Sequence, residues 1–325
     1  AVTAVLFTCA GQRVDIVSAF REAGATTIAA DADPLSPTLY HAHCATPVPL
    51  VRDPEYIPAL ARIVADHDVR LIVPLTDLDQ ELLGRHRAAL EPALVLVPDP
   101  QVCQAMGDKW LAHSFFEEHG IDSPRAWLPE DVPADARFPL LVKVREGFGS
   151  RHIYHCAAAD ELAFFLRYTR VESFVQEACL GEEFSIDVFC DLEGRCLGAI
   201  PRSMILSKGG ESIRGRSLRD EELIAHGVRV AETIGVVGPA NIQCFREPDG
   251  TLPVTDVNLR FGGGFPVPWR AGSGYASLAL ALARGERPEP CLGNFREGVV
   301  MSRFFSDFCL VEGEDGVLRP FVPPT

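Results

Sequence analysis

The stretch from Asn241 to Gly264 reads NIQCFREPDGTLPVTDVNLRFGGG and contains two runs of alternating apolar residues around an Asp249-Gly250 pair. An Asp-Gly pair between two such runs predicts a β-hairpin, because both central residues of a type I′ turn need positive φ. A turn centred between these two residues sets Gln243 opposite Asp256. The rest of the chain is interpreted around this predicted hairpin.

Three oxygen-bearing side chains of this hairpin are expected on one face. Side chains alternate between the two faces of a strand, so Gln243, Asp256 and Asn258 fall together. Arg260 follows one pleat further on. Hard oxygen ligands beside a guanidinium suit Mg²⁺ and phosphate. A polar, solvated hairpin face explains the same pattern, and this stretch alone does not decide between the two.

The composition is that of a globular protein with more acidic than basic residues. The chain has 325 residues, of which 47% are hydrophobic and 23% charged, and its formal net charge is −15. This length predicts about two or three domains. Nucleic acid is not expected as a partner, because its phosphate backbone requires clustered Lys and Arg. No run approaches the ~20 apolar residues of a membrane span, so no membrane partner is expected.

Ten cysteines are scattered along the chain without a C-x-x-C pair or a zinc-type spacing. We expect them to be buried, reduced thiols, which predicts a cytoplasmic protein. The opening run AVTAVLFTCAG is too short for a signal peptide and has no basic flank. It is therefore interpreted as a first strand.

Residues 1–107 alternate apolar strands with helical patterns. Strands are expected at residues 2–10, 26–31, 70–77 and 93–99. This alternation predicts an α/β domain with a doubly wound parallel sheet covered on both faces. Ligands bind such sheets at the carboxyl ends of the strands, which points to Gly11–Arg13 and Thr76–Asp77. Helix capping and ordinary loop chemistry are the simpler explanation of both loops. No G-x-G-x-x-G follows the first strand, so no dinucleotide site is expected.

Two lysines stand where an anion would stabilise them. Asp108 is expected to cap a helix that carries Lys109 in its first turn, where the helix dipole favours anions over cations. Lys143 is the one charge in the apolar strand LLVKV, and burying it without a partner is costly. We expect an anionic partner for Lys143, whereas a surface lysine is the simpler reading of Lys109.

The segment from Gly147 to Ser150 is a glycine-bearing turn between two expected strands. Its backbone N–H groups suit the oxygens of a phosphate. A hairpin loop whose glycines serve only the turn explains it equally well. It is not the phosphate loop of the G-x-x-x-x-G-K-[ST] kind, because no Lys-Ser or Lys-Thr follows.

A connector from Glu177 to Gly181 joins two expected strands, and its backbone is free to pair with a flat heterocycle. Glu183 then suits the hydroxyl groups of a ribose. An exposed acidic turn is the alternative.

Residues 200–217 form the most basic window of the chain, and this window suits a loop that grips an anionic substrate or a transferring phosphoryl group. A solvated loop is the competing view. The basic residues of this window are Arg202, Lys208, Arg214 and Arg216.

In this order the pieces resemble the ATP-grasp superfamily. The most similar form is that of carbamoyl-phosphate synthase large-subunit halves, biotin carboxylase and related carboxylate–amine ligases. The resemblance covers nearly the whole chain and is most specific between Gln243 and the run DVNLR that ends at Arg260. Next comes the run from Gln176 to Glu183, QEACLGEE.

The resemblance implies an ATP-grasp fold behind the N-terminal domain. Residues 1–107 would be the pre-ATP-grasp, substrate-side domain. Residues 108–190 would hold the lid and nucleotide subdomain, with the lid at about 138–174. Residues 191–325 would form the C-terminal subdomain with the metal site.

The resemblance also implies roles for single residues. The nucleotide contacts it implies are Lys109, Lys143, Gly147, Gly149, Ser150, Glu177, Cys179, Leu180 and Glu183. The implied metal ligands, for Mg²⁺ with Mn²⁺ as the alternative, are Gln243, Asp256 and Asn258. Arg260 is implied beside an acyl phosphate, and Lys208 and Arg214 of the basic window join it as expected catalytic residues. The family usually has Glu where this chain has Asp256, which is one methylene shorter.

The implied activity is ATP-dependent ligation of a small-molecule carboxylate to an amine through an acyl phosphate, with ADP and phosphate as products. One alternative is an enzyme that phosphorylates bicarbonate, as the carbamoyl-phosphate synthase halves do. A second is an ATP-binding module without catalysis. If the chain associates, we expect a homodimer.

Overall fold

Five parallel strands of the N-terminal part form one sheet in the order β3-β2-β1-β4-β5. The strands are β1 (Ala4–Thr8), β2 (Thr26–Asp31), β3 (Cys44–Pro47), β4 (Val69–Pro74) and β5 (Leu94–Val95). Its helices are α1 (Val14–Glu22), α2 (Tyr56–Asp66) and α3 (Gln80–Arg85). Every residue of β1 is buried, as expected for a strand whose sheet is covered on both faces. The predicted doubly wound α/β domain is confirmed.

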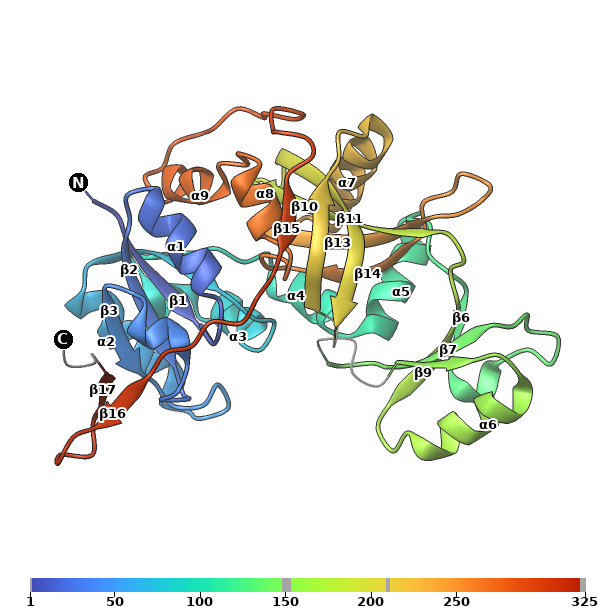
Figure 1. Ribbon diagram of the computed structural model, residues 1–325, viewed down its shortest axis with the longest axis horizontal. Helices are drawn as coiled ribbons and strands as arrows, with labels where there is room; N and C mark the ends of the chain where they lie inside the picture. Colours follow the sequence, from blue (N-terminus) through green and yellow to red (C-terminus); the bar gives the residue numbers. More distant parts are fainter. Residues whose placement is uncertain (1, 148–152, 209–210, 322–325) are drawn as a thin grey trace.

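The computed structural model describes residues 2–147, 153–208 and 211–321, and the side chains of residues 207, 208 and 211 lie outside this description. Along its longest axis the N-terminal sheet lies at one end, a large antiparallel sheet in the middle and a small sheet with one helix at the other end (Figure 1). Two helices, α4 (Pro100–Gly107) and α5 (Lys109–Glu118), lie between the N-terminal sheet and the small sheet.

The small sheet has the strand order β6-β9-β7-β8. Its strands are β6 (Ala126–Trp127), β7 (Leu140–Val144), β8 (Ile153–Cys156) and β9 (Ser173–Glu177), and α6 (Ala159–Tyr168) packs against them. This unit has a hydrophobic core of its own, formed by Leu140, Val142, Cys156, Leu162 and Val175. We call residues 126–177 the lid unit, after the lid expected at about 138–174.

The large sheet is antiparallel in the order β14-β13-β10-β11-β12-β15. Its strands are β10 (Glu182–Cys190), β11 (Cys196–Lys208), β12 (Glu211–Ser217), β13 (Gly238–Arg246), β14 (Val254–Asn258) and β15 (Val300–Ser302). A helix, α7 (Glu221–Ile234), covers one face, and Ile186 of β10 packs directly against Gly227 of this helix. Because β10 belongs to the large sheet, the boundary between the small and the large sheet lies before Glu182. The boundary between subdomains expected at residue 190 lies at the end of β10.

The N-terminal sheet and the large sheet share one continuous hydrophobic core. Phe20 of α1 meets Phe261, which follows β14, edge to face at a ring distance of 6.1 Å. Two helices, α8 (Pro266–Arg270) and α9 (Tyr275–Ala283), follow this segment. None of the described residues of the lid unit belongs to this shared core, and the lid unit has its own.

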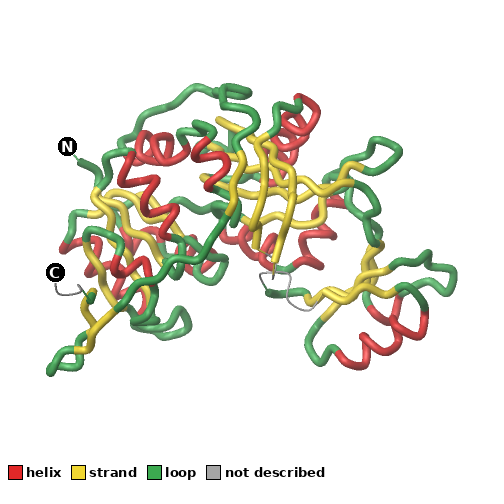
Figure 2. Tube along the Cα trace, viewed as in Figure 1, coloured by secondary structure: helices red, strands yellow, loops and turns green. Residues whose placement is uncertain are grey.

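The chain returns to the N-terminal domain after β15. The hairpin of β16 (Leu310–Glu312) and β17 (Leu318–Pro320) lies beside it, and the ring of Phe308 meets that of His41 at 6.5 Å. Figure 2 shows the segment between β15 and β16 as a long loop that runs from the large sheet to the N-terminal domain.

All ten cysteines are free thiols, as expected. Half of them are buried, whereas Cys291 and Cys309 are exposed, so the expectation of burial is only partly confirmed. Within the described ranges, no helix combines the length and the apolar character needed to cross a membrane.

Candidate nucleotide and metal site

The predicted pairing of the β13–β14 hairpin is confirmed, since Gln243 lies opposite Asp256. The predicted type I′ turn is wrong. Of the central pair, only Gly250 has positive φ (86°), and the turn is closed by Glu247, whose N–H donates to Thr251 O at 3.0 Å. This turn offsets the two strands by one residue relative to a turn centred on the Asp-Gly bond.

A bulge in β14 removes that offset. Cys244 pairs with Val254 whereas Gln243 pairs with Asp256, so Thr255 is an extra residue in the strand. The bulge restores the predicted register at the functional end of the hairpin. It also turns the Thr255 carbonyl toward the lid unit, where it accepts a hydrogen bond from Lys143 Nζ at 3.3 Å.

Lys143 of β7 is almost fully buried, with 5% of its surface exposed. Its Nζ donates to Gln176 Oε1 at 3.1 Å as well as to the Thr255 carbonyl, and it lies 5.8 Å from the ring of Phe174. Both acceptors are neutral oxygens, so the expected anionic partner of Lys143 stays a prediction. Burial lowers the pKa of Lys143 below its ordinary value, and the carboxylate of Asp256 opposes this shift.

Lys109 begins α5, as predicted, and Asp108 caps that helix by accepting hydrogen bonds from the backbone N–H groups of Trp110 (2.8 Å) and Leu111 (3.3 Å). Lys109 Nζ donates to Gly147 O at 2.9 Å and lies 3.9 Å from Asp256 Oδ1. Two lysines from separate elements therefore approach one carboxylate of the hairpin.

Asp108 also fixes the lid unit against α5. Arg145, at the end of β7, donates to Asp108 Oδ2 from Nε at 2.9 Å. The backbone N–H of Lys109 donates to Arg145 O at 2.9 Å. These contacts set the distance between the start of α5 and the strand that carries Lys143.

The predicted metal set contains one carboxylate, Asp256, and two amides, Gln243 and Asn258. Asn258 Oδ1 accepts a hydrogen bond from Arg260 Nη2 at 3.2 Å. The part of the chain that the structure describes holds no group of three or more His, Cys, Asp and Glu side chains suited to a metal. Mg²⁺ is commonly held by one or two carboxylates together with substrate phosphates. The set therefore suits a Mg²⁺ ion that is also bound by the phosphates of a nucleotide. It suits a metal ion bound by the protein alone poorly.

Arg260 reaches the N-terminal domain. Its Nε lies 3.3 Å from Asp77 Oδ2, and its Nη1 donates to Phe261 O at 3.2 Å. Beside it, the buried side chain of Gln80 donates to Leu259 O at 2.7 Å. The loop after β4, one of the two strand ends expected to face a ligand, therefore lies at this site.

The loop after β1 lies there too. Arg13 donates to Phe261 O and to Gly262 O, both at 2.9 Å, and pairs with Asp15. Arg303 donates to Gly263 O. These arginines hold the carbonyl groups of the glycine-rich segment that follows Arg260.

A buried polar network lies beneath this glycine-rich segment. Arg202 Nε donates to Asp187 Oδ2 at 2.8 Å, and Asn241 Nδ2 donates to Asp187 Oδ1 at 3.0 Å. A Cβ at Gly264 would lie 2.3 Å from Arg202 Cζ, so any larger residue there would have to displace the buried Arg202 guanidinium. Asp187 could not be predicted as part of this network, because it stands in an alternating strand like any other residue there.

The predicted adenine connector lies between β9 and β10. Glu177 accepts hydrogen bonds from Arg125 at 2.6 and 3.1 Å. Leu180 is exposed, and its backbone N–H donates to Glu247 Oε1 at 3.0 Å. Burial, followed by the charge of Glu247, raises the pKa of Cys179 to about 12. Glu247, in the turn of the β13–β14 hairpin, is a contact of this connector that sequence reasoning missed.

Glu183 belongs to the same electrostatic neighbourhood as the lysines. Burial raises its pKa above the ordinary value, and the charges of Arg202 and Lys143 oppose that shift. Its place on β10 brings a carboxylate within range of Lys143, as expected for a residue of the nucleotide site.

Arg214 is not brought to this cluster. On the same strand, Arg216 pairs with Ser203 of β11, which pairs with Phe184 of β10, which pairs with Cys244 of β13. The side chain of Arg216 therefore lies on the same face of the sheet as that of Cys244, which is the face opposite Gln243. Arg214, two residues away, shares that opposite face and is exposed. Of the remaining predicted residues, Gly149, Ser150 and the side chain of Lys208 lie outside the described residues.

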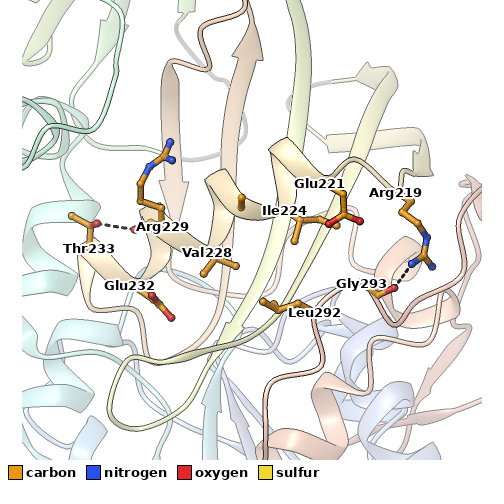
Figure 3. A pocket seen from close by; sticks show the side chains of 10 residues that line it. Arg219, Glu221, Ile224, Val228, Arg229, Glu232, Thr233, Leu292 and Gly293 are labelled. Atoms are coloured by element: carbon orange, nitrogen blue, oxygen red, sulfur yellow. Dashed lines mark hydrogen bonds between the residues drawn. The ribbon is translucent and has the colours of Figure 1, made fainter.

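A surface pocket of about 840 Å³ lies over the outer side of α7, lined in part by Ile224, Val228 and Leu292 (Figure 3). Beside it, Arg219 donates to Gly293 O. Because α7 covers the face of the sheet opposite Gln243, this pocket is separate from the candidate site.

Two family models match the chain. Residues 5–96 match a model described as PylC-like, N-terminal domain, and residues 169–303 match one described as ATP-grasp in the biosynthetic pathway with Ter operon. Among curated proteins, none matches this chain.

Several solved structures share the fold. Pyruvate carboxylase of Rhizobium etli superposes with a TM-score of 0.72 and 17% identity over 92% of this chain, which covers 30% of that protein. The biotin carboxylase domain of Hydrogenobacter thermophilus 2-oxoglutarate carboxylase was solved with MgADP, ADP and bicarbonate. It superposes with a TM-score of 0.72 and 17% identity, over 91% of this chain and 73% of its own.

An L-amino acid ligase from Bacillus licheniformis gives a TM-score of 0.67 and 18% identity, over 86% of this chain and 74% of its own. Identities this low establish a shared fold. Together with the two family models, they show that the chain has an ATP-grasp fold with a PylC-like N-terminal domain, and that it resembles ATP-grasp ligases.

Proposed function

We propose that the chain is an ATP-dependent carboxylate–amine ligase that acts through an acyl phosphate and releases ADP and phosphate. One observation carries this proposal, namely the approach of Lys109 and Lys143 to Asp256 from separate elements. Two ammonium groups beside one carboxylate leave excess positive charge, which suits a triphosphate with its metal ion.

The hairpin supplies oxygen ligands for a metal ion. Asp256, Asn258 and Gln243 would hold Mg²⁺, with Mn²⁺ as the alternative, and the ion when bound would neutralise charge on the phosphate oxygens. Lys109 and Lys143 would bind the same oxygens from the other side. Whether one or two ions bind depends on how far the short Asp256 side chain reaches.

Arg260 marks the substrate side of the site. Its guanidinium would bind the substrate carboxylate as this carboxylate attacks the γ-phosphate of ATP and displaces ADP. The amine would then attack the acyl phosphate and displace phosphate. Asp77, 3.3 Å from Arg260 Nε, would attract an ammonium group and repel a second negative charge. This supports an amine-bearing acid as the substrate over bicarbonate, which is the runner-up.

An acyl phosphate must be kept from water, and the lid unit is placed to do this. It carries Lys143 and has its own core, whereas the N-terminal sheet and the large sheet share one. We therefore propose that the lid unit closes over ATP as one body while the substrate side stays fixed.

Substrate-dependent ADP release tests the proposal. We expect ADP with at least one member of an amino acid panel and Mg²⁺, and much less with bicarbonate alone. ADP release with bicarbonate alone would favour the carbamoyl-phosphate synthase-like alternative. ATP binding without ADP across the whole panel would favour the non-catalytic module. The homodimer and the cytoplasmic location remain predictions, which the mass in solution and fractionation test.

A further inference from the structure

The acceptors of the buried Lys143 ammonium come from two different sheets. Gln176 lies on β9, the strand beside β7, and 3% of its surface is exposed. Thr255 lies on β14 of the large sheet, and its carbonyl is available because the bulge removes it from regular pairing. Lys143 Nζ thus joins the lid unit to the β13–β14 hairpin through two neutral oxygens, at 3.1 and 3.3 Å.

Neutral acceptors are an unusual choice for a buried lysine. An ammonium has three N–H donors, and a carboxylate is the partner that best compensates its charge. Among the described residues, no carboxylate oxygen lies within 4.0 Å of Lys143 Nζ, whereas Asp256 lies 3.9 Å from Lys109. The two oxygens therefore fix the direction of Lys143, which forms no ion pair among the described residues and keeps its third donor for a ligand.

We propose that Gln176 is a positioning residue for the nucleotide: its side-chain oxygen, with the Thr255 carbonyl, aims the Lys143 ammonium at a phosphate group of ATP. This inference rests on the proposed function, because it requires that the site binds ATP. The amide is essential in this role, since a carboxylate of the same length would pair with Lys143 and compete with the phosphate.

The test compares the affinities for ATP and for adenosine, which has no phosphate. In Gln176→Glu, a carboxylate replaces the amide about 3.1 Å from Nζ. We expect ATP affinity to fall ~tenfold or more, the usual scale for a charge-assisted hydrogen bond, and adenosine affinity to stay unchanged. Gln101→Glu adds the same charge at an exposed position on α4 and is expected to change neither affinity.

A second comparison uses a variant without the Lys143 ammonium. In Lys143→Met, the added substitution Gln176→Glu is expected to have little further effect on ATP affinity, because no ammonium remains to pair with. If Gln176→Glu does not fold, Gln176→Met serves instead. It keeps the length without the oxygen, and is expected to lose a few-fold in ATP affinity with none in adenosine affinity.

The outcomes separate this inference from the proposed function. A wild-type chain that binds adenosine but not ATP would overturn both. A wild-type chain that binds ATP, with Gln176→Glu binding ATP equally well, would overturn the inference alone. So would an equal loss of ATP and adenosine affinity in Gln176→Glu and Gln176→Met, which would mean that Gln176 only supports packing.

Discussion

On the nucleotide side of the candidate site, the buried Lys143 donates to neutral oxygens and forms no ion pair among the described residues. On the substrate side, Arg13 is paired with Asp15, and Arg260 lies beside Asp77. The lysine side is suited to a highly charged group, because Lys143 forms no ion pair among the described residues. On the arginine side both guanidinium groups already lie beside carboxylates, and Arg13 also holds the backbone of the loop after β14.

The packing agrees with this division. The arginine side lies where the N-terminal sheet and the large sheet share a core, and Gln80 and Arg13 hold the backbone on either side of Arg260. The lysine side is carried partly by the lid unit, which has its own core. A rigid substrate side and a nucleotide side that closes would together keep water from an acyl phosphate.

The largest effect is expected from Asp256→Ala. Loss of the one carboxylate in the metal set should lower ATP turnover by at least ~10²–10³-fold, the scale measured for a lost electrostatic contact in a transition state. The fold should persist, because Asp256 is partly exposed, and circular dichroism and thermal melting check this. Asp249→Ala, on the turn of the same hairpin, is the control and should turn over normally. Normal turnover in Asp256→Ala would remove the metal assignment.

Arg260→Gln should separate the two sides most clearly. We expect ADP release that depends on the substrate to fall ~10²-fold, because the charge beside the acyl phosphate is lost. ATP affinity should remain within about twofold, since Arg260 contacts Asp77, Asn258 and Phe261 rather than the lysines. Steady-state kinetics and nucleotide titration measure the two effects. Equal losses in both would mean that the sides are not distinct.

Gly264→Ala tests the rigidity of the arginine side. The new Cβ would lie 2.3 Å from Arg202 Cζ in a buried network, so we expect a loss of about 1–3 kcal/mol in the free energy of unfolding. Gly263→Ala is the matched control, because a Cβ there meets nothing within 4 Å, and it should change stability by less than about 0.5 kcal/mol. Equal melting temperatures for the two variants would contradict the packing described.

The smallest effect is expected in the pH dependence of ATP binding. Burial lowers the pKa of Lys143 below its ordinary value of 10.5, so this lysine loses its proton at a lower pH than an exposed lysine does. ATP affinity should therefore decline as the pH rises toward 10.5 and be regained as the pH falls. Lys143→Arg, whose guanidinium does not titrate in this range, should weaken the decline. Affinity that is independent of pH in the wild-type chain would show that Lys143 does not bind phosphate.

Much of the fold follows from local patterns. The N-terminal parallel sheet, the cap at Asp108 and the pairing of Gln243 with Asp256 were all predicted from sequence. These features depend on strand and helix periodicity, on capping chemistry and on turn residues, which act over a few neighbouring positions.

The contacts that define the site were not predictable in this way. The turn and the bulge at Thr255 each shift the strand by one residue, and the register is correct only because the shifts cancel. Lys143 meets neutral oxygens from distant segments, and Arg13 meets the loop after β14 across 248 residues. Arg214 was placed by its charge alone, and the strand register assigns it to the other face. Such contacts depend on tertiary packing, which composition and spacing do not encode locally.

A structure of the chain with an ATP analogue and Mg²⁺ would test the nucleotide and metal assignments together. We expect phosphate oxygens within hydrogen-bond distance of Nζ of both Lys109 and Lys143, and a metal ion bound by Asp256 and Asn258. A nucleotide bound elsewhere, or one whose phosphates do not contact these lysines, would contradict it.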